Sequence, residues 1–401
     1  MDRLLELSAK HGAQMIADRR YIHQNAELSN LEFKTCAYVK EQLDQIGIQA
    51  DAMAGTGLQG MIWGKNPKGK TIMLRADMDA LPIKETTGLP FASQNEGAMH
   101  ACGHDAHTAA LLGAARILYE MRDQLNGNVK LCFQPGEEGG GGAERMIKDG
   151  IMENPSVDYA VATHMDARFV VGQAAIKPGV ISSYPNAFLF KIRGKGGHGA
   201  RPHMSLDPIA PAVMIYSFLE GLRKRIPPEE SCIIQVCKFQ AGSSFNITPD
   251  TAELAGTTRT VSLKTKEFVQ AKMEEIASLV VALYGVECEV TFSGKTAPAP
   301  VVNTLEYVAP AKRSAAKVFT EGYGSYESVT GAEDFSAYGR YVPTTLIRVG
   351  CKGDDPSTHF MVHNSNFTID ERAVVNAAAA MASIAVDYLS GDFILDKMEE
   401  Q

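Results

Sequence analysis

The sequence has no continuous apolar run that approaches the roughly 18 residues of a membrane span, so we expect no membrane segment. It also has no block of basic residues, and its 47 acidic and 39 basic side chains give a formal net charge of −8. This balance argues against a nucleic-acid partner. Its seven cysteines are an odd number scattered along the chain, which does not fit a secreted disulfide framework. Residues 1–20 carry apolar side chains at helical spacing without an export signal, which favours a helix of the mature protein and a cytoplasmic location.

What the sequence does contain is the composition of an ordinary globular protein, with 45% hydrophobic and 21% charged residues. A chain of 401 residues is expected to form about two domains. Residues 1–183 alternate helices, the first two expected at 1–12 and 13–23, with apolar strands, which predicts an α/β layer with a mostly parallel sheet. Residues 184–297 follow the order β-α-β-β-α-β of a ferredoxin-like α+β domain. The α/β rhythm resumes in residues 298–401, so the smaller domain is predicted to interrupt a single larger one.

The densest group of potential metal ligands lies between Met99 and Thr108. Cys102 and His104 are two residues apart, so both side chains point to the same side of an extended segment. A helix is predicted to start near Asp105, which puts the pair at a strand-to-helix junction. Taken alone the pair is a weak signal, because a buried structural thiol beside a surface histidine explains it more simply.

Glu137 and Glu138 follow the apolar run 129–133, which predicts a buried strand that ends just before them. Neighbouring side chains on an extended backbone diverge. If Glu138 turns toward a metal ion, Glu137 therefore points to one side of it, where it could act as a base on a water. Pro135 before the pair and the glycines at 139–142 after it predict a shaped loop. The alternative is an ordinary solvated acidic turn.

Two further histidines, His164 and His363, follow short apolar runs, and histidines at strand ends can converge on one edge of a sheet. Each alone is equally well explained as a structural histidine. With Cys102, His104 and Glu138 they provide five donors of mixed nitrogen, oxygen and sulfur type. That is more than one tetrahedral ion with an open position needs, so a two-metal site is predicted.

Several motifs resemble those of one known family. They are Arg19-Arg20-x-Ile22-His23, Leu74-Arg75-Ala76-Asp77-Met78-Asp79-Ala80-Leu81-Pro82, Met99-His100-Ala101-Cys102-Gly103-His104-Asp105, Phe133-Gln134-Pro135-x-Glu137-Glu138-Gly139, Gly194-Lys195-Gly196-Gly197-His198-Gly199-Ala200, Phe245-Asn246-x-x-Pro249-Asp250, Gly331-x-Glu333-Asp334-Phe335 and Val362-His363. Together they cover nearly the whole chain and resemble the amidohydrolase branch of the dinuclear aminoacylase/carboxypeptidase G metallopeptidase family. That branch includes bacterial N-acyl-amino-acid amidohydrolases, hippurate hydrolases and plant indoleacetyl-amino-acid hydrolases.

The resemblance implies an enzyme that hydrolyses N-acyl amino acids to a carboxylic acid and a free amino acid. It implies a dinuclear-metal exopeptidase-like catalytic domain interrupted by a lid and dimerisation domain. Two divalent ions are the implied cofactors, zinc or manganese, with cobalt or nickel as substitutes. The implied metal ligands are Cys102, His104, Glu138, His164 and His363. Glu137 is the implied general base on a metal-bridging water, and Asp77 the carboxylate that orients the site from behind.

The resemblance leaves the substrate open. Asn25-Ala26 stands where relatives usually have His-Pro, and Met165-Asp166-Ala167 stands where they more often have a bulkier segment. These departures remove neither a ligand nor the base. A metallo-dipeptidase or carboxypeptidase on the same scaffold is the nearest alternative. A catalytically silent homologue that keeps its metal site is a more distant one, and the presence of Glu137 beside a complete ligand set speaks against it.

The free carboxylate of an N-acyl amino acid needs a cation, which we expect close to Asn246. Arg259, near the end of a predicted strand, is the candidate because a guanidinium binds a carboxylate with two hydrogen bonds; a solvated strand arginine is an equally good reading. His198 lies between glycines that let the backbone present an imidazole into a cleft. The resemblance implies that the inserted domain pairs with its copy in a homodimer and offers His198 to the partner's metal site. His203 is the local alternative.

Overall fold

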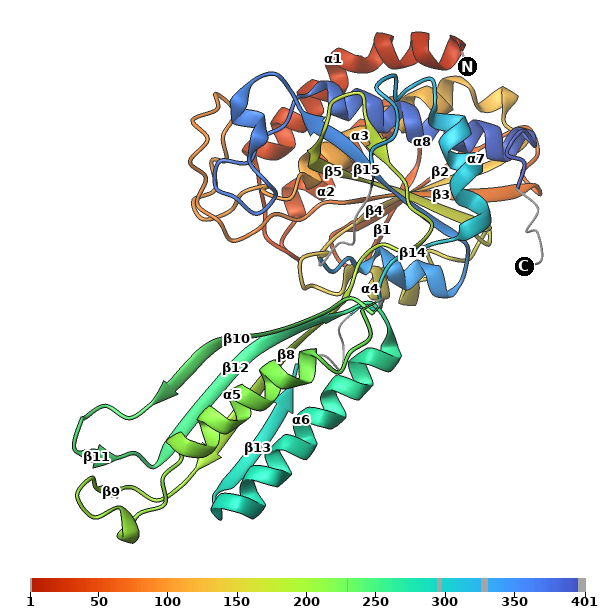
Figure 1. Cartoon of the computed structure of the whole chain (residues 1–401). Coiled ribbons are helices and arrows are strands. Elements are labelled where there is room, and N and C mark those ends of the chain that lie inside the picture. The colour runs from red at the N-terminus through yellow and green to blue at the C-terminus, as the bar shows by residue number, and fades with distance from the viewer. Residues whose placement is uncertain (1, 229, 294–297, 326–330, 396–401) are drawn as a thin grey trace. The chain divides into compact units, whose positions relative to one another are not determined.

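The structure is a computed structural model, in which residues 2–228, 230–293, 298–325 and 331–395 are described. The chain divides into two compact units (Figure 1). Unit 1 comprises Met1–Gly179, Val301–Glu327 and Asp334–Gln401, and unit 2 comprises Val180–Pro300 and Ser328–Glu333. Unit 2 therefore interrupts unit 1 in the sequence. Its main segment, Val180–Pro300, contains the residues 184–297 that were expected to form the inserted domain.

Unit 1 is built on a seven-stranded mixed sheet in the order β1-β2-β4-β3-β5-β15-β6. Its strands are β1 (Ala50–Met53), β2 (Gly57–Trp63), β3 (Lys70–Asp77), β4 (Gly127–Gln134), β5 (Tyr159–Val170), β6 (Ala174–Ala175) and β15 (Thr344–Lys352). The central strands β4, β3, β5 and β15 are parallel, whereas β1, β2 and β6 join antiparallel at the edges. Parallel strands in such sheets are covered on both faces, and every residue of β4 is buried.

Helices of unit 1 flank this sheet (Figure 1). They are α1 (Asp2–Gln24), α2 (Phe33–Ile46), α3 (His104–Glu120), α4 (Gly142–Lys148), α7 (Leu305–Ala315) and α8 (Arg372–Ser390), with the short 3-10 helix η3 (Asp334–Arg340). α1, α3 and α8 pack against one another, and α3 and α8 also contact β3. α8 is long and apolar enough to cross a membrane by length and composition, but 72% of its apolar window is buried inside the structure. That burial is typical of a core helix.

Unit 2 contains a four-stranded antiparallel sheet in the order β10-β12-β8-β13. Its elements are β8 (Tyr184–Arg193), α5 (Ile209–Arg223), β10 (Cys232–Ala241), β12 (Thr251–Thr260), α6 (Leu263–Tyr284) and β13 (Glu287–Phe292). Both helices lie on one face of the sheet (Figure 1) and share a core with it that includes Phe190, Leu254 and Met273. Two short strands, β9 (Gly197–His198) and β11 (Ile247–Thr248), form a separate pair.

The predicted fold class is confirmed, with a mixed sheet whose central strands are parallel in one unit and the ferredoxin-like order in the other. Besides several short strands that were not predicted, three details differ from the prediction. The two helices expected at the N-terminus form the single helix α1, because Gly12 is buried within it and packs near Val375 instead of ending it. Strand β5 does not stop at Thr163 but continues to Val170, since β15 keeps pairing with it. The edge strand β1 was missed because it has no apolar run.

Candidate metal centre

The carboxyl ends of the central parallel strands bring several predicted site residues to one level of the sheet. Asp77 at the end of β3 lies opposite Gln134 at the end of β4. Because Arg75 of β3 lies opposite Ala162 of β5, His164, two residues further along, reaches the level of Asp77. In open α/β sheets this edge is where ligands bind.

Cys102 and His104 lie at the start of α3, with Gly103 between them. Gly103 has a φ of +89°, a left-handed conformation that favours glycine. A Cβ at this position would also lie 3.2 Å from Cβ of Met165. The glycine therefore turns the chain from the loop that carries the thiol into the helix that carries the imidazole. Both side chains are buried.

The five predicted metal ligands come together in two overlapping groups. Ligand atoms of Cys102, His104 and His164 lie within 4.8 Å of one another, and so do those of Cys102, Glu138 and His363. Cys102 Sγ lies 3.6 Å from His164 Nε2, and His363 Nε2 lies 3.3 Å from Glu138 Oε1. Because the two groups share Cys102, one thiolate could contact two ions at once.

The chemistry of these donors fits a transition metal. His104 Nε2 is buried without a hydrogen-bond partner in the part of the chain that the structure describes, which is costly unless a ligand satisfies it. His104 Nδ1 donates to the backbone oxygen of Asp79 at 2.8 Å, so Nε2 is the atom left to bind an ion. A mixture of thiolate, imidazole and carboxylate suits zinc and other divalent transition metals.

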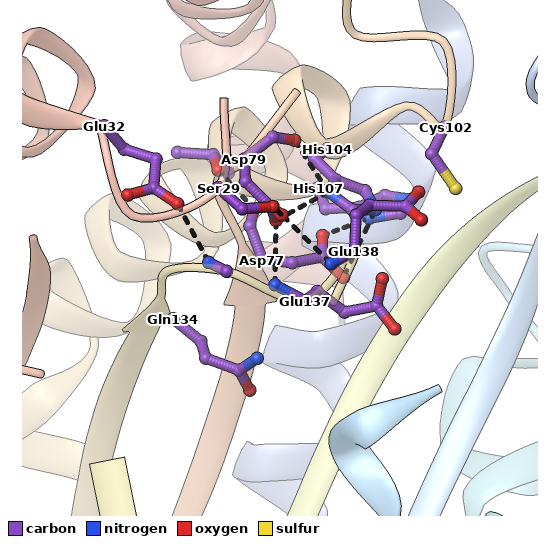
Figure 2. Close-up of polar contacts among 12 residues, drawn as sticks. Ser29, Glu32, Asp77, Asp79, Cys102, His104, His107, Gln134, Glu137 and Glu138 are labelled. Atoms are coloured by element: carbon purple, nitrogen blue, oxygen red, sulfur yellow. Dashed lines mark hydrogen bonds and ion pairs between the residues drawn. The ribbon is translucent and has the colours of Figure 1, made fainter. Parts of the chain in front are cut away.

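Asp77 lies beside His104 and His107 (Figure 2), and its carboxylate is held by two donors. Arg75 Nη1 donates to Oδ2 at 2.6 Å, and His107 Nδ1 lies 2.6 Å from Oδ1. His107 Nε2 in turn accepts the N–H of Met165 at 2.8 Å, which fixes the His107 proton on Nδ1. Burial alone would raise the pKa of Asp77, but His104, Arg75 and His107 hold it well below its ordinary value. Asp77 is therefore a charged carboxylate, 3.8 Å from His104 Nε2.

Asp79, whose role was not predicted from the sequence, connects His104 with the loop of Glu137 and Glu138 (Figure 2). Its Oδ1 accepts the N–H of Glu137 and its Oδ2 the N–H of Glu138, each at 3.0 Å. Ser29 Oγ donates to Oδ2 at 2.6 Å. Burial would raise the pKa of Asp79, but the hydrogen bonds, led by that from His104, lower it. The spacing of Asp77 and Asp79, two residues apart at a strand end, is the signal that could have revealed this residue.

Glu137 and Glu138 lie on a turn rather than on an extended segment. Carboxylate oxygens of both lie within 4.8 Å of a ring nitrogen of His104, so the side chains diverge less than the extended-backbone argument predicted. Their other partners differ, since Glu138 joins the group with Cys102, whereas Glu137 Oε1 accepts the N–H of Asp334 at 3.3 Å. Glu138 therefore faces the predicted metal ligands, whereas Glu137 lies beside them.

The loop that carries the two glutamates is anchored by Glu32. Glu32 is buried, and its Oε1 accepts the N–H of Gly136 at 2.9 Å (Figure 2). Burial raises the pKa of Glu32. The glycines after the pair are needed because the chain folds back on itself, and a Cβ at Gly142 would lie only 1.6 Å from the Pro135 oxygen. The glycine run shapes the loop, as expected.

The two strand-end histidines differ from their predicted positions. His164 lies within β5, and its Nδ1 donates to the Met165 oxygen at 2.7 Å, which leaves Nε2 for Cys102 or an ion. Burial and the Arg348 guanidinium lower the pKa of His164 well below its ordinary value, so this imidazole is neutral. His363 follows no strand but lies on a turn with a φ of +66°. Its N–H donates to the Ala101 oxygen at 2.7 Å, which ties the turn to the Cys102 loop.

Unit 2 holds the remaining predicted residues. His198 is exposed on β9, and the Asn246 oxygen accepts the N–H of Gly199 at 2.9 Å, so these two predicted residues lie close together. Arg259 pairs with Pro185 near the far end of β12, roughly 25 Å or more from Asn246 at about 3.4 Å per strand residue. In one chain most of a ten-residue strand therefore separates Arg259 from Asn246, and a shared role of the two residues in binding a substrate carboxylate stays a prediction.

Comparison with known proteins decides the family. Residues 73–387 match the model of "Peptidase family M20/M25/M40". The chain belongs to this peptidase family. It is 38% identical to thermostable carboxypeptidase 1 of Saccharolobus solfataricus over 93% of this chain and 95% of that protein. It is 37% identical to N-acetyl-L-cysteine deacetylase of Bacillus subtilis over 96% of this chain and 89% of that protein.

A plant protein and a solved structure are also similar to this chain. IAA-amino acid hydrolase ILR1-like 4 of Arabidopsis thaliana is 35% identical over 94% of this chain and 86% of its own length. The crystal structure of a dinuclear metal binding peptidase from the M20 family of Bacillus subtilis superposes with a TM-score of 0.81, at 32% identity over 95% of this chain and 99% of that one. The family that the motifs resemble is thereby confirmed.

We expect metal binding by this M20-family protein to strengthen as the pH rises. Burial raises the pKa of the Cys102 thiol. Burial alone would lower the pKa of His104, but Asp77 raises it well above its ordinary value. Both groups hold protons at neutral pH in the metal-free protein and must release them to bind an ion. The dissociation constant for zinc, measured by chelator competition between about pH 6 and 8, should fall about tenfold or more per pH unit.

The neutral imidazole of His164 should release no proton, so replacing His164 by alanine should weaken binding without changing its pH slope. Calorimetry in two buffers of different ionisation enthalpy would count the released protons. An affinity that does not change over this pH range would show that the protonation states assigned to Cys102 and His104 are wrong.

Proposed function

We propose that this M20-family protein hydrolyses the amide bond of N-acyl amino acids, with Glu137 as general base. The observation that carries the proposal is the pair of three-residue groups that share Cys102, with the Glu137 carboxylate beside them. The family match supports hydrolysis of an amide. The relatives that deacetylate N-acetyl-L-cysteine and hydrolyse IAA-amino acids support the substrate class.

Two divalent ions are the proposed cofactors, zinc or manganese, with cobalt or nickel as substitutes. Cys102, His104 and His164 would hold one ion, and Cys102, Glu138 and His363 the other. When bound, such ions polarise a scissile carbonyl and lower the pKa of water. We also infer a cytoplasmic location, which the seven free thiols of the structure support.

The residues around the ions have separate proposed tasks. Glu137 takes a proton from the attacking water and delivers it to the departing amine, so that a free amino acid leaves. Asp77, whose carboxylate lies 3.8 Å from His104 Nε2, is the proposed carboxylate that orients the site, while the Asp79 oxygen that accepts from His104 Nδ1 keeps the imidazole in place. Arg259 is the proposed partner of the substrate carboxylate, because a guanidinium and a carboxylate form charge-assisted hydrogen bonds.

A carboxypeptidase is the second candidate, favoured by 38% identity to a thermostable carboxypeptidase. Both reactions release an amino acid whose carboxylate is free, so the same Arg259 contact would serve both. They differ in the other half of the substrate, which is a simple acyl group in one case and a peptide in the other. A metallo-dipeptidase differs again, because its substrates carry a free amine.

The substrate class is tested by measuring kcat/KM of the metal-loaded protein on matched compounds. The set comprises N-acetyl, N-benzoyl and long-chain N-acyl derivatives of several amino acids, the corresponding dipeptides, and N-acyl amino acid amides that lack the carboxylate. We expect acyl amino acids to be the best substrates and the amides to be about 10- to 100-fold poorer, the cost of losing a charge-assisted hydrogen bond. Faster cleavage of the dipeptides would favour the metallo-dipeptidase or the carboxypeptidase over the acyl-amino-acid hydrolase, and no cleavage of any compound would exclude all three.

The two adjacent glutamates should differ in what they lose on substitution. Glu137→Gln should lower kcat by about 1,000-fold or more while the metal content stays near that of the wild type, since only the proton transfer is lost. Glu138→Gln should lose metal, because the amide replaces a charged ligand. Elemental analysis and kinetics of both variants provide the check, each serving as the control for the other. Equal metal loss in the two would contradict the assignment of base and ligand.

We further propose a homodimer in which His198 completes the partner's site. Ala200 donates its N–H to His198 Nδ1 at 3.1 Å, so neutral His198 carries its proton on Nε2 and can donate outward. Such an N–H could stabilise the oxygen on which charge develops. Around it Phe245 is 101% exposed, Ile247 58% and Met204 60%. An apolar cluster of this kind is typical of a surface covered by a partner.

Subunit mixing tests this arrangement. His198→Ala and Glu137→Gln homodimers should each be nearly inactive, since one oxyanion donor is worth roughly 3 kcal/mol. After exchange of subunits, one site of each heterodimer carries neither substitution and should regain activity. Mass spectrometry would verify the exchange. Heterodimers that stay inactive would exclude the trans role and leave His198 to act within its own chain or not at all.

A further inference from the structure

A single buried arginine joins the floor of the candidate metal centre to a second carboxylate. Arg75 is 1% exposed. Its Nη1 donates to Asp77 Oδ2 at 2.6 Å, and its Nη2 donates to Asp334 Oδ1 at 2.9 Å. The remaining Nε donates to Gln134 Oε1 at 2.9 Å. The planar guanidinium therefore holds two acidic residues that are far apart in the sequence in one fixed geometry.

The Asp334 carboxylate accepts hydrogen bonds from three donors. Besides Arg75, Gln134 Nε2 donates to Oδ1 at 2.8 Å, and the N–H of Ala143, at the start of α4, donates to Oδ2 at 3.0 Å. Tyr338 Oη donates to Gln134 Oε1 at 3.0 Å and keeps that amide from turning. Because the Asp334 side chain is fixed by three donors, its backbone at the start of η3 is fixed as well.

The backbone N–H of Asp334 points to the glutamate that matters most for the proposed chemistry. It donates to Glu137 Oε1 at 3.3 Å, and a carboxylate oxygen of Asp334 lies within 4.8 Å of one of Glu137. The other neighbour of this loop, Asp79, holds the backbone of Glu137 but not its carboxylate. The direction of the Glu137 side chain is therefore linked to the position of η3.

We propose that Asp334 and Arg75 are positioning residues that aim the Glu137 carboxylate. Arg75 ties Asp334 to Asp77, so the same guanidinium sets the base and the carboxylate behind the metal ligands relative to each other. Neither residue touches substrate or ions in this account. The inference rests on the proposed function, in which Glu137 transfers the proton, and it adds how the fold keeps that side chain in reach.

The test compares Asp334→Asn and Arg75→Lys with the wild type on the best acyl amino acid. Asparagine keeps the volume of Asp334 but presents an amide to the Ala143 N–H, and lysine can reach only one of the two carboxylates. We expect kcat to fall about 10- to 100-fold, as for other residues that orient an active site from outside. KM should stay within about twofold, and the metal content and the cobalt absorption spectrum should not change.

The matched control is Arg340→Ala, which removes a surface ion pair of 2.7 Å between η3 and α4 but leaves the buried network intact. It should change kcat by less than about twofold. In the double variant Arg75→Lys/Asp334→Asn the loss of kcat should not exceed that of the less active single variant, because both changes break the same connection.

Several results would overturn the inference. They are an unchanged kcat in a folded, metal-loaded Asp334→Asn protein, a loss that follows metal content, and fully multiplicative losses in the double variant. If Asp334→Asn does not fold, Arg75→Lys decides by the same criteria. A wild type that cleaves none of the acyl amino acids would instead count against the proposed function, so the two failures are distinguishable.

Discussion

The candidate metal centre depends on one buried carboxylate, Asp79. It accepts hydrogen bonds from the backbone of both Glu137 and Glu138, and its own backbone oxygen accepts one from His104. The segment after β3, the start of α3 and the loop after β4 are thereby joined at Asp79. Burying a charge without such partners would cost several kcal/mol. The donors that lower the pKa of Asp79 are thus the same groups that set the geometry of the site.

Acidic and basic side chains alternate in the buried network next to Asp79. Arg75 lies between Asp77 and Asp334, and the Asp77 carboxylate faces His104. The Arg75 guanidinium balances the charges of Asp77 and Asp334, which would otherwise repel each other beside the candidate metal ligands. The arrangement also explains why β3 carries charged residues within a buried strand, where apolar residues are the rule. The alternation of β3 separates its functional face from the core face of Ile72, Leu74 and Ala76.

Much of the fold and of the candidate metal centre was predictable from the sequence, because periodicity and spacing are local properties. The strands that end at Asp77 and before Glu137, the order of elements in unit 2 and the five metal-ligand candidates were all found that way. The turn of His363 and the single helix α1 were not, because they depend on packing against distant segments. The role of Asp79 depends on where three separate segments meet. The separation of Arg259 from Asn246 depends on strand direction, which no local pattern reports.

The central claim is that two ions share the Cys102 thiolate. Anomalous diffraction from crystals of the zinc-loaded protein, recorded on both sides of the zinc absorption edge, tests it most directly. The account predicts two zinc peaks about 3.5–4 Å apart, one within bonding distance of His104 and His164 and the other of Glu138 and His363, with the Cys102 sulfur between them. A single peak, peaks elsewhere, or a Cys102 sulfur bound to neither ion would contradict it.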